Sequence, residues 1–92
     1  MGYDTLKPYD DAYGLENYII DICGDGCDGL SEEAIHSLVK HIYGNLYSTD
    51  HINVAIDILL NKGKIITDGH HFIDPIMCPN TAKRVLAGER II

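Results

Sequence analysis

The sequence contains no tryptophan, one phenylalanine and three prolines in 92 residues. It has no apolar run near the roughly 20 residues that a membrane-spanning helix needs, and no basic segment leading into an apolar core as in a secretory signal. We therefore expect no membrane contact and a cytoplasmic or otherwise intracellular location. Basic residues are scarce, with 7 Lys and Arg against 14 Asp and Glu. A hydrophobic fraction of 46% is ordinary for a globular protein, and this length predicts one domain.

Cysteine is scarce as well. Cys23, Cys27 and Cys78 cannot all pair within one chain, so the count predicts no disulfide framework and fits a reducing compartment. It leaves room for one internal bridge in an oxidising or thermophilic setting. A zinc site would have to join these cysteines to His70 or His71, and no second compact pair accompanies the loose spacing of Cys23 and Cys27. We expect no zinc site.

One stretch resembles a calcium-binding loop in part. Asp21, Asp25, Gly26 and Glu32 fall at positions 1, 5, 6 and 12 of that template. Cys23 stands at position 3, where an oxygen ligand is needed, so the ligand set is incomplete. No acid–base or nucleophile arrangement is recognisable either. The sequence therefore predicts no metal, no cofactor and no enzymatic activity.

Charge is distributed unevenly along the chain. Residues 1–33 carry nine acidic residues and one basic residue, whereas residues 34–92 carry five acidic and six basic residues. Four of the six tyrosines also lie in the first eighteen residues. Tyrosine is favoured at protein interfaces, and an acidic surface attracts a basic one. We therefore predict a protein-binding surface in the N-terminal third, with the candidate residues Tyr9, Asp10, Asp11, Tyr13, Glu16, Asp25 and Asp28.

Periodicity and turn residues divide the chain into short elements. Residues 1–9 read as an irregular arm, and residues 10–92 as one domain. The expected elements are a helix that starts at Asp10 or Asp11, a short strand at Leu30, helices over Ser31–Tyr43 and Ser48–Asn61, strands at Lys64–Thr67 and His71–Ile73, and a helix from Asn80 or Thr81 to Leu86. Asp68-Gly69 is a hairpin signal between the last two strands.

The two central helices each show an apolar face. In the first it consists of Ala34, Ile35, Leu38 and Ile42, and in the second of Ile52, Ala55, Ile56, Leu59 and Leu60. Spacings of three and four residues place each set on one side of its helix, so we expect the two faces to share a core.

The order helix, turn, helix and hairpin over Leu30–Ile73 resembles the winged helix-turn-helix superfamily. The best-matching part is Ala55–Ile65, which looks like the end of a recognition helix followed by a Lys-Gly turn into the wing. The resemblance implies an α+β domain, with a three-helix core, a two-stranded wing hairpin and a short C-terminal helix. Members are mostly DNA-binding regulators, and many serve as protein-interaction modules.

The second central helix has the wrong charges for DNA. Its face opposite the core holds Asp50, Asn53, Val54, Asp57 and Asn61, with two acids and no base. We therefore predict a non-enzymatic module that binds a protein with a basic surface, as an inhibitor, an adaptor or a partial DNA mimic. Small acidic proteins of that kind are frequent among viral proteins directed at host factors.

The alternative is a transcriptional regulator that binds double-stranded DNA, as a homodimer. Polar and basic side chains at the start of the second helix and in the wing would then contact DNA. These candidates are Ser48, Thr49, His51, Asn53, Lys62, Lys64, His70 and His71.

Overall fold

The computed structural model describes the backbone of residues 10–91 and the side chains of residues 14–91. The elements in chain order are α1 (Asp10–Gly24), β2 (Leu30–Ser31), α2 (Glu32–Tyr43), α3 (Thr49–Asn61), β3 (Ile66–Thr67), β4 (His71–Ile73) and α4 (Pro79–Leu86). The predicted α+β class is confirmed. The predicted arm over residues 1–9 lies outside the described residues.

The two central helices begin at serine caps, as the sequence indicates. The Ser31 hydroxyl accepts a hydrogen bond from the Ala34 N–H, and the Ser48 hydroxyl accepts one from the His51 N–H, each at 3.1 Å. Such caps satisfy backbone donors that have no partner within the helix. Gly44 ends α2 with a φ of +62°, a conformation that glycine adopts without strain. The caps therefore fix where the two helices start and how sharply the chain turns between them.

The sheet has three antiparallel strands in the order β2-β4-β3. Leu30 lies opposite Phe72 on one side of β4, and Ile66 lies opposite Ile73 on the other. The strand expected at Leu30 is present and makes the sheet three-stranded. β3 is shorter than the predicted Lys64–Thr67, because the Lys64 N–H still bonds the Leu59 carbonyl of α3, at 2.9 Å.

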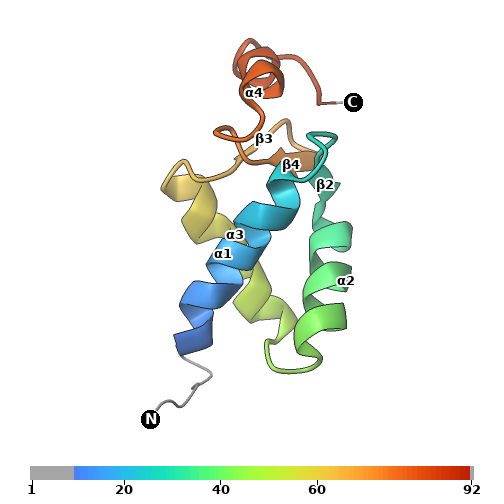
Figure 1. The fold of residues 1–92 in the computed structure, drawn as a ribbon, viewed down its shortest axis with the longest axis vertical. Coiled ribbons are helices and arrows are strands. Elements are labelled where there is room, and N and C mark those ends of the chain that lie inside the picture. The colour runs from blue at the N-terminus through green and yellow to red at the C-terminus, as the bar shows by residue number, and fades with distance from the viewer. Residues whose placement is uncertain (1–9, 92) are drawn as a thin grey trace.

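The main core lies between α1, α2 and α3, and the molecule is elongated, at 46 × 22 × 22 Å. Figure 1 shows these three helices on one side of the small sheet, with α4 on the other side at the end of the long axis. A second, smaller core joins α4 to the sheet and the C-terminal segment through Ile73, Cys78, Ala82 and Ile91.

Two expectations for the helices are wrong in detail. Ile42 is 56% exposed, although it was placed on the buried face, whereas Val39 is buried. The last turn of α2 is instead covered by aromatic contacts of Tyr43 with Tyr18 and Tyr47. The final helix begins at Pro79 rather than Asn80 or Thr81, because proline fits the first turn, where no helical N–H bond is lost.

Candidate functional site

Exposed acids gather where α1 ends and α2 begins. Asp25 and Asp28 lie in the loop between α1 and β2, and both are exposed. The loop turns through left-handed conformations at Gly26, Cys27 and Gly29. Three further exposed acids lie on the adjoining helical turns, namely Asp21, Glu32 and Glu33. The sequence has no Lys or Arg between Pro8 and Ala34, so no basic residue of this segment offsets these acids.

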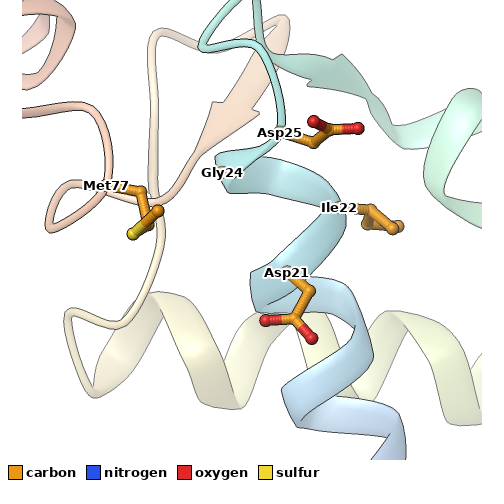
Figure 2. Close-up of a pocket in the computed structure, with 5 residues that line it drawn as sticks. All are labelled: Asp21, Ile22, Gly24, Asp25 and Met77. Atoms are coloured by element: carbon orange, nitrogen blue, oxygen red, sulfur yellow. The ribbon is translucent and has the colours of Figure 1, made fainter.

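A hollow of about 460 Å³ lies beside this loop, lined by Asp21, Ile22, Gly24, Asp25 and Met77. Figure 2 shows Met77 facing the turn of α1 at Gly24, with Asp21 on the turn before it and Asp25 just after it, while the side chains of Ile22 and Asp25 point away from Met77. A Cβ at Gly24 would lie 3.1 Å from the Met77 Cβ. Glycine at this position therefore allows the loop that carries Met77 to lie directly against α1.

A disulfide bond between Cys27 and Cys78 holds the two sides of the hollow together. Sequence reasoning allowed one bridge but did not choose its partners. The Cys27 sulfur lies 3.7 Å from the Met77 carbonyl oxygen, so the cross-link is adjacent to the Met77 wall. The Gly24 carbonyl oxygen lies 3.9 Å from the Cys27 sulfur and 3.7 Å from the Cys78 sulfur. The end of α1, the following loop and the segment before α4 are thus joined at one point.

Asp74 fixes the segment that leads to Met77. It is buried, its N–H donates to the Cys23 carbonyl at 3.3 Å, and its carboxylate accepts a hydrogen bond from the Ile76 N–H at 2.9 Å. Its own carbonyl accepts from the Cys78 N–H at 3.0 Å. Burial, and then the nearby charge of Asp74, raise the pKa of the buried Cys23 thiol to about 12. Cys23 is thus a protonated core thiol at neutral pH, and it takes no part in the disulfide.

Four of the five residues predicted for the outer face of α3 are exposed, namely Asp50, Val54, Asp57 and Asn61, and these define the outer face from here on. The fifth, Asn53, is half-buried beside His36. Val54 is 53% exposed and lies between the two acids. The expectation that both aspartates point outward is confirmed by their exposure. This face presents an apolar side chain bordered by negative charge, and it carries no base.

The candidate DNA-binding residues fall into two groups. Several are already engaged within the chain: Ser48 caps α3, Asn53 Oδ1 lies 2.8 Å from His36 Nε2, and His71 is paired with Ser31 in the sheet. The Lys62 ammonium lies 3.8 Å from the Glu16 carboxylate. The others are Thr49, Lys64 and His70, which are exposed, and His51, which is exposed although its ring makes an edge contact with Tyr47.

The structure describes the side chains of only some of the candidate protein-binding residues. Tyr9 lies outside the described residues. Asp10, Asp11 and Tyr13 belong to α1, but their side chains are not among those described. Glu16 is half-buried beside Lys62, whereas Asp25 and Asp28 are exposed. The structure adds Asp21 and Met77 to this region, and sequence reasoning missed Met77 because it is 52 residues along the chain from Asp25.

Within residues 14–91, no three or more His, Cys, Asp or Glu side chains group so that they could hold a metal ion. Among the helices described, none has both the length and the apolar character required to cross a membrane. No family model matches the chain, and no curated protein or solved structure is significantly similar to it.

Proposed function

We propose that this chain is a winged-helix module. The strand order β2-β4-β3 supports this class, since a short strand ahead of α2 joins the edge of a hairpin that follows α3. The helix pair α2 and α3 precedes that hairpin with a five-residue turn between them, Gly44 to Ser48. In such a domain α3 is the helix that would enter the major groove of DNA.

We further propose that the module acts without catalysis, by binding a protein partner with a basic surface. The observation that carries this proposal is the outer face of α3. A helix that lies in a DNA groove needs donors and positive charge toward bases and phosphates. Here Asp50 and Asp57 would face phosphates, and the exposed Val54 between them has the character of a protein contact.

The side chains that remain for DNA are few. Asn53 is engaged with His36 and Ser48 caps its own helix, so both would lose an existing hydrogen bond on turning to DNA. Lys62 is partly neutralised by Glu16. Because few basic side chains on this side of the domain are free to contact phosphates, little counterion release would drive DNA binding.

Titration of duplex DNA, followed by fluorescence anisotropy at 50 and 150 mM salt, tests this proposal. The unmodified chain should bind no tighter than the ~10⁻⁴–10⁻⁶ M of non-specific complexes at physiological salt. Asp50→Asn with Asp57→Asn should bind DNA more tightly, because two like charges leave the phosphate-facing surface. The matched control is Asp21→Asn with Asp25→Asn, which changes total charge equally at a different surface and should improve DNA binding less.

The protein partner gives the second half of the test. Reversal of Asp10 and Asp11 to Lys should slow association with a partner captured from the native host, and the effect should shrink as salt rises. Nanomolar, sequence-selective DNA binding by the unmodified chain would overturn the proposal. It would assign the start of α3 and the hairpin to DNA.

A further inference from the structure

The loop between β4 and α4 presents two large apolar side chains to solvent. Ile76 is 79% exposed and Met77 is 66% exposed. Both follow the buried Asp74, whose carboxylate holds the Ile76 N–H. The next residue is Cys78, which is cross-linked to Cys27. These apolar side chains therefore stand on a segment that is fixed at both ends.

The hollow beside Met77 adjoins this apolar loop and has an acidic rim. Asp21 and Asp25 line it from either side of Gly24 (Figure 2). Asp21 and Asp25 are four residues apart at the end of α1, and like charges at this spacing repel each other. Neither carboxylate has a hydrogen bond or ion pair within the part of the chain that is described. An apolar wall and a negatively charged rim match a side chain with an aliphatic stem and a cationic head.

We infer that Ile76, Met77 and the adjoining hollow form a docking surface for a basic segment of a protein partner, with an arginine side chain of that segment in the hollow. The stem of the arginine would cover Met77, and its guanidinium would pair with the Asp21 carboxylate, while Asp25 adds negative charge from the other side of Gly24. Charge complementarity selects this occupant over an acidic or purely apolar one. The inference rests on the proposed function, since it names the chemistry of the basic partner.

The disulfide gives this surface a fixed shape before a partner arrives. Because Cys27 and Cys78 join the acidic loop to the Met77 segment, little conformational freedom remains to be lost on binding. Reduction of the bond should separate the two walls of the hollow. The surface should therefore bind its partner better in the oxidised chain than in the reduced one.

A nuclear magnetic resonance titration with a matched pair of peptides tests the inference. The probe is acetyl-Ala-Leu-Arg-Leu-Ala-amide, and its control replaces arginine with citrulline, which keeps the shape and removes the charge. The arginine peptide should shift the amide signals of residues 21–25 and 76–78. The citrulline peptide should bind at least about fivefold more weakly, as expected for a small number of exposed ion pairs.

Two double variants test where on the protein the arginine peptide binds. Asp21→Asn with Asp25→Asn should weaken binding of the arginine peptide by about fivefold. Glu33→Gln with Glu89→Gln, which removes the same charge at residues that do not line the hollow, should weaken it by less than about twofold. Both pairs are exposed, so signal dispersion in the unbound spectra should show that the fold is kept. A phosphine reductant, which converts the disulfide to two thiols and is itself oxidised, should weaken binding as well.

Several results would overturn the inference. Equal binding of the two peptides, equal losses in the two double variants, or displacement of the peptide by micromolar calcium would each remove the arginine site. These outcomes leave the proposed function standing if the unmodified chain still fails to bind DNA tightly. Nanomolar DNA binding would instead remove the proposed function whatever the peptides do.

Discussion

Asp68 connects the β3–β4 hairpin to the C-terminal segment. Its carboxylate accepts backbone hydrogen bonds from His70 at 2.8 Å, His71 at 2.7 Å and Ile91 at 2.8 Å. Arg84 Nη2 donates to the Ile91 carbonyl at 3.1 Å, so the same residue is held from both sides. Ile91 is buried as a result and completes the smaller core. One carboxylate thus shapes the turn and also docks the end of the described chain.

This arrangement predicts a pH dependence. Partial burial alone would raise the pKa of Asp68, but the hydrogen bonds from Ile91, His71 and His70, with the nearby His71 ring, outweigh it and hold that pKa well below its usual range. A carboxyl whose pKa is lowered by folding stabilises the protein above its unfolded pKa of about 3.9. That contribution is lost as pH falls below about 4.

Asp68→Asn should therefore lower the free energy of unfolding at pH 7 by about 1–2 kcal/mol, a range kept low because water partly screens the group. The difference between parent and variant should shrink between pH 5 and pH 2, as measured by urea unfolding. Asp28→Asn is the control. Because Asp28 is exposed, the free energy of unfolding of this variant should differ little from that of the parent. A parent–variant difference that does not change with pH would contradict this role for Asp68.

The sequence predicts the role of Asp68 in the turn, but not its hydrogen bond to the C-terminal segment. Asp-Gly between two apolar strands indicates the turn, and the turn is present. The bond to Ile91 spans 23 residues, and no local pattern encodes it. The cysteines show the same limit, because three of them allow three pairings and only the fold brings Cys27 to Cys78.

At the scale of elements, periodicity predicts the apolar face of α3 well and that of α2 only in part. Of the five residues predicted for the apolar face of α3, four are buried and Leu60 is half-buried; the buried ones are Ile52, Ala55, Ile56 and Leu59. In α2 the prediction is correct at Ile35 and wrong at Ile42, because the buried face continues through Val39 to Tyr43 rather than through Leu38 to Ile42. The last turn of α2 is therefore packed, but through Tyr43. Helical spacing alone does not decide between two apolar faces that lie next to each other.

This difference can be measured with two substitutions of similar size. Leu59→Ala should lower the free energy of unfolding by about 2–4 kcal/mol, because Leu59 is 1% exposed and its removal leaves a cavity. Ile42→Ala, at an exposed position on the last turn of α2, should cost less than about 0.5 kcal/mol. Chemical denaturation of both variants gives the comparison. Equal losses would mean that α2 and α3 do not pack as described.

The whole molecule contains two hydrophobic cores of unequal size, one after the other along its long axis. The larger one joins α1, α2 and α3, and the smaller one joins α4 and the C-terminal segment to the sheet. The sequence predicts all four helices and the hairpin from periodicity and turn residues, with serine caps to mark the starts of α2 and α3. It does not predict that α4 stands apart from the bundle or that a hollow forms against α1, since both depend on contacts between distant residues.

The disulfide is the covalent link between these two parts, and its removal should separate their stabilities. Cys27→Ser with Cys78→Ser opens a loop whose ends are 51 residues apart, for which chain-entropy arguments give a loss of about 4 kcal/mol as an upper value. We expect a measured loss of about 2–4 kcal/mol in the free energy of unfolding. Protection should fall first in α4, where the Ala82 N–H bonds the Cys78 carbonyl at 2.9 Å.

Reduction provides the matched control for this substitution, because it breaks the same bond without changing the sequence. A phosphine reductant should lower the stability of the parent to that of the double variant and leave the variant unchanged. Cys23 should not interfere: its raised pKa keeps the thiol protonated, and its burial hides it from alkylating reagents until the chain unfolds. Amide exchange in α4 that stays slow after reduction would show that the smaller core holds this helix without the cross-link. In that case the disulfide would stabilise only the loop beside the hollow.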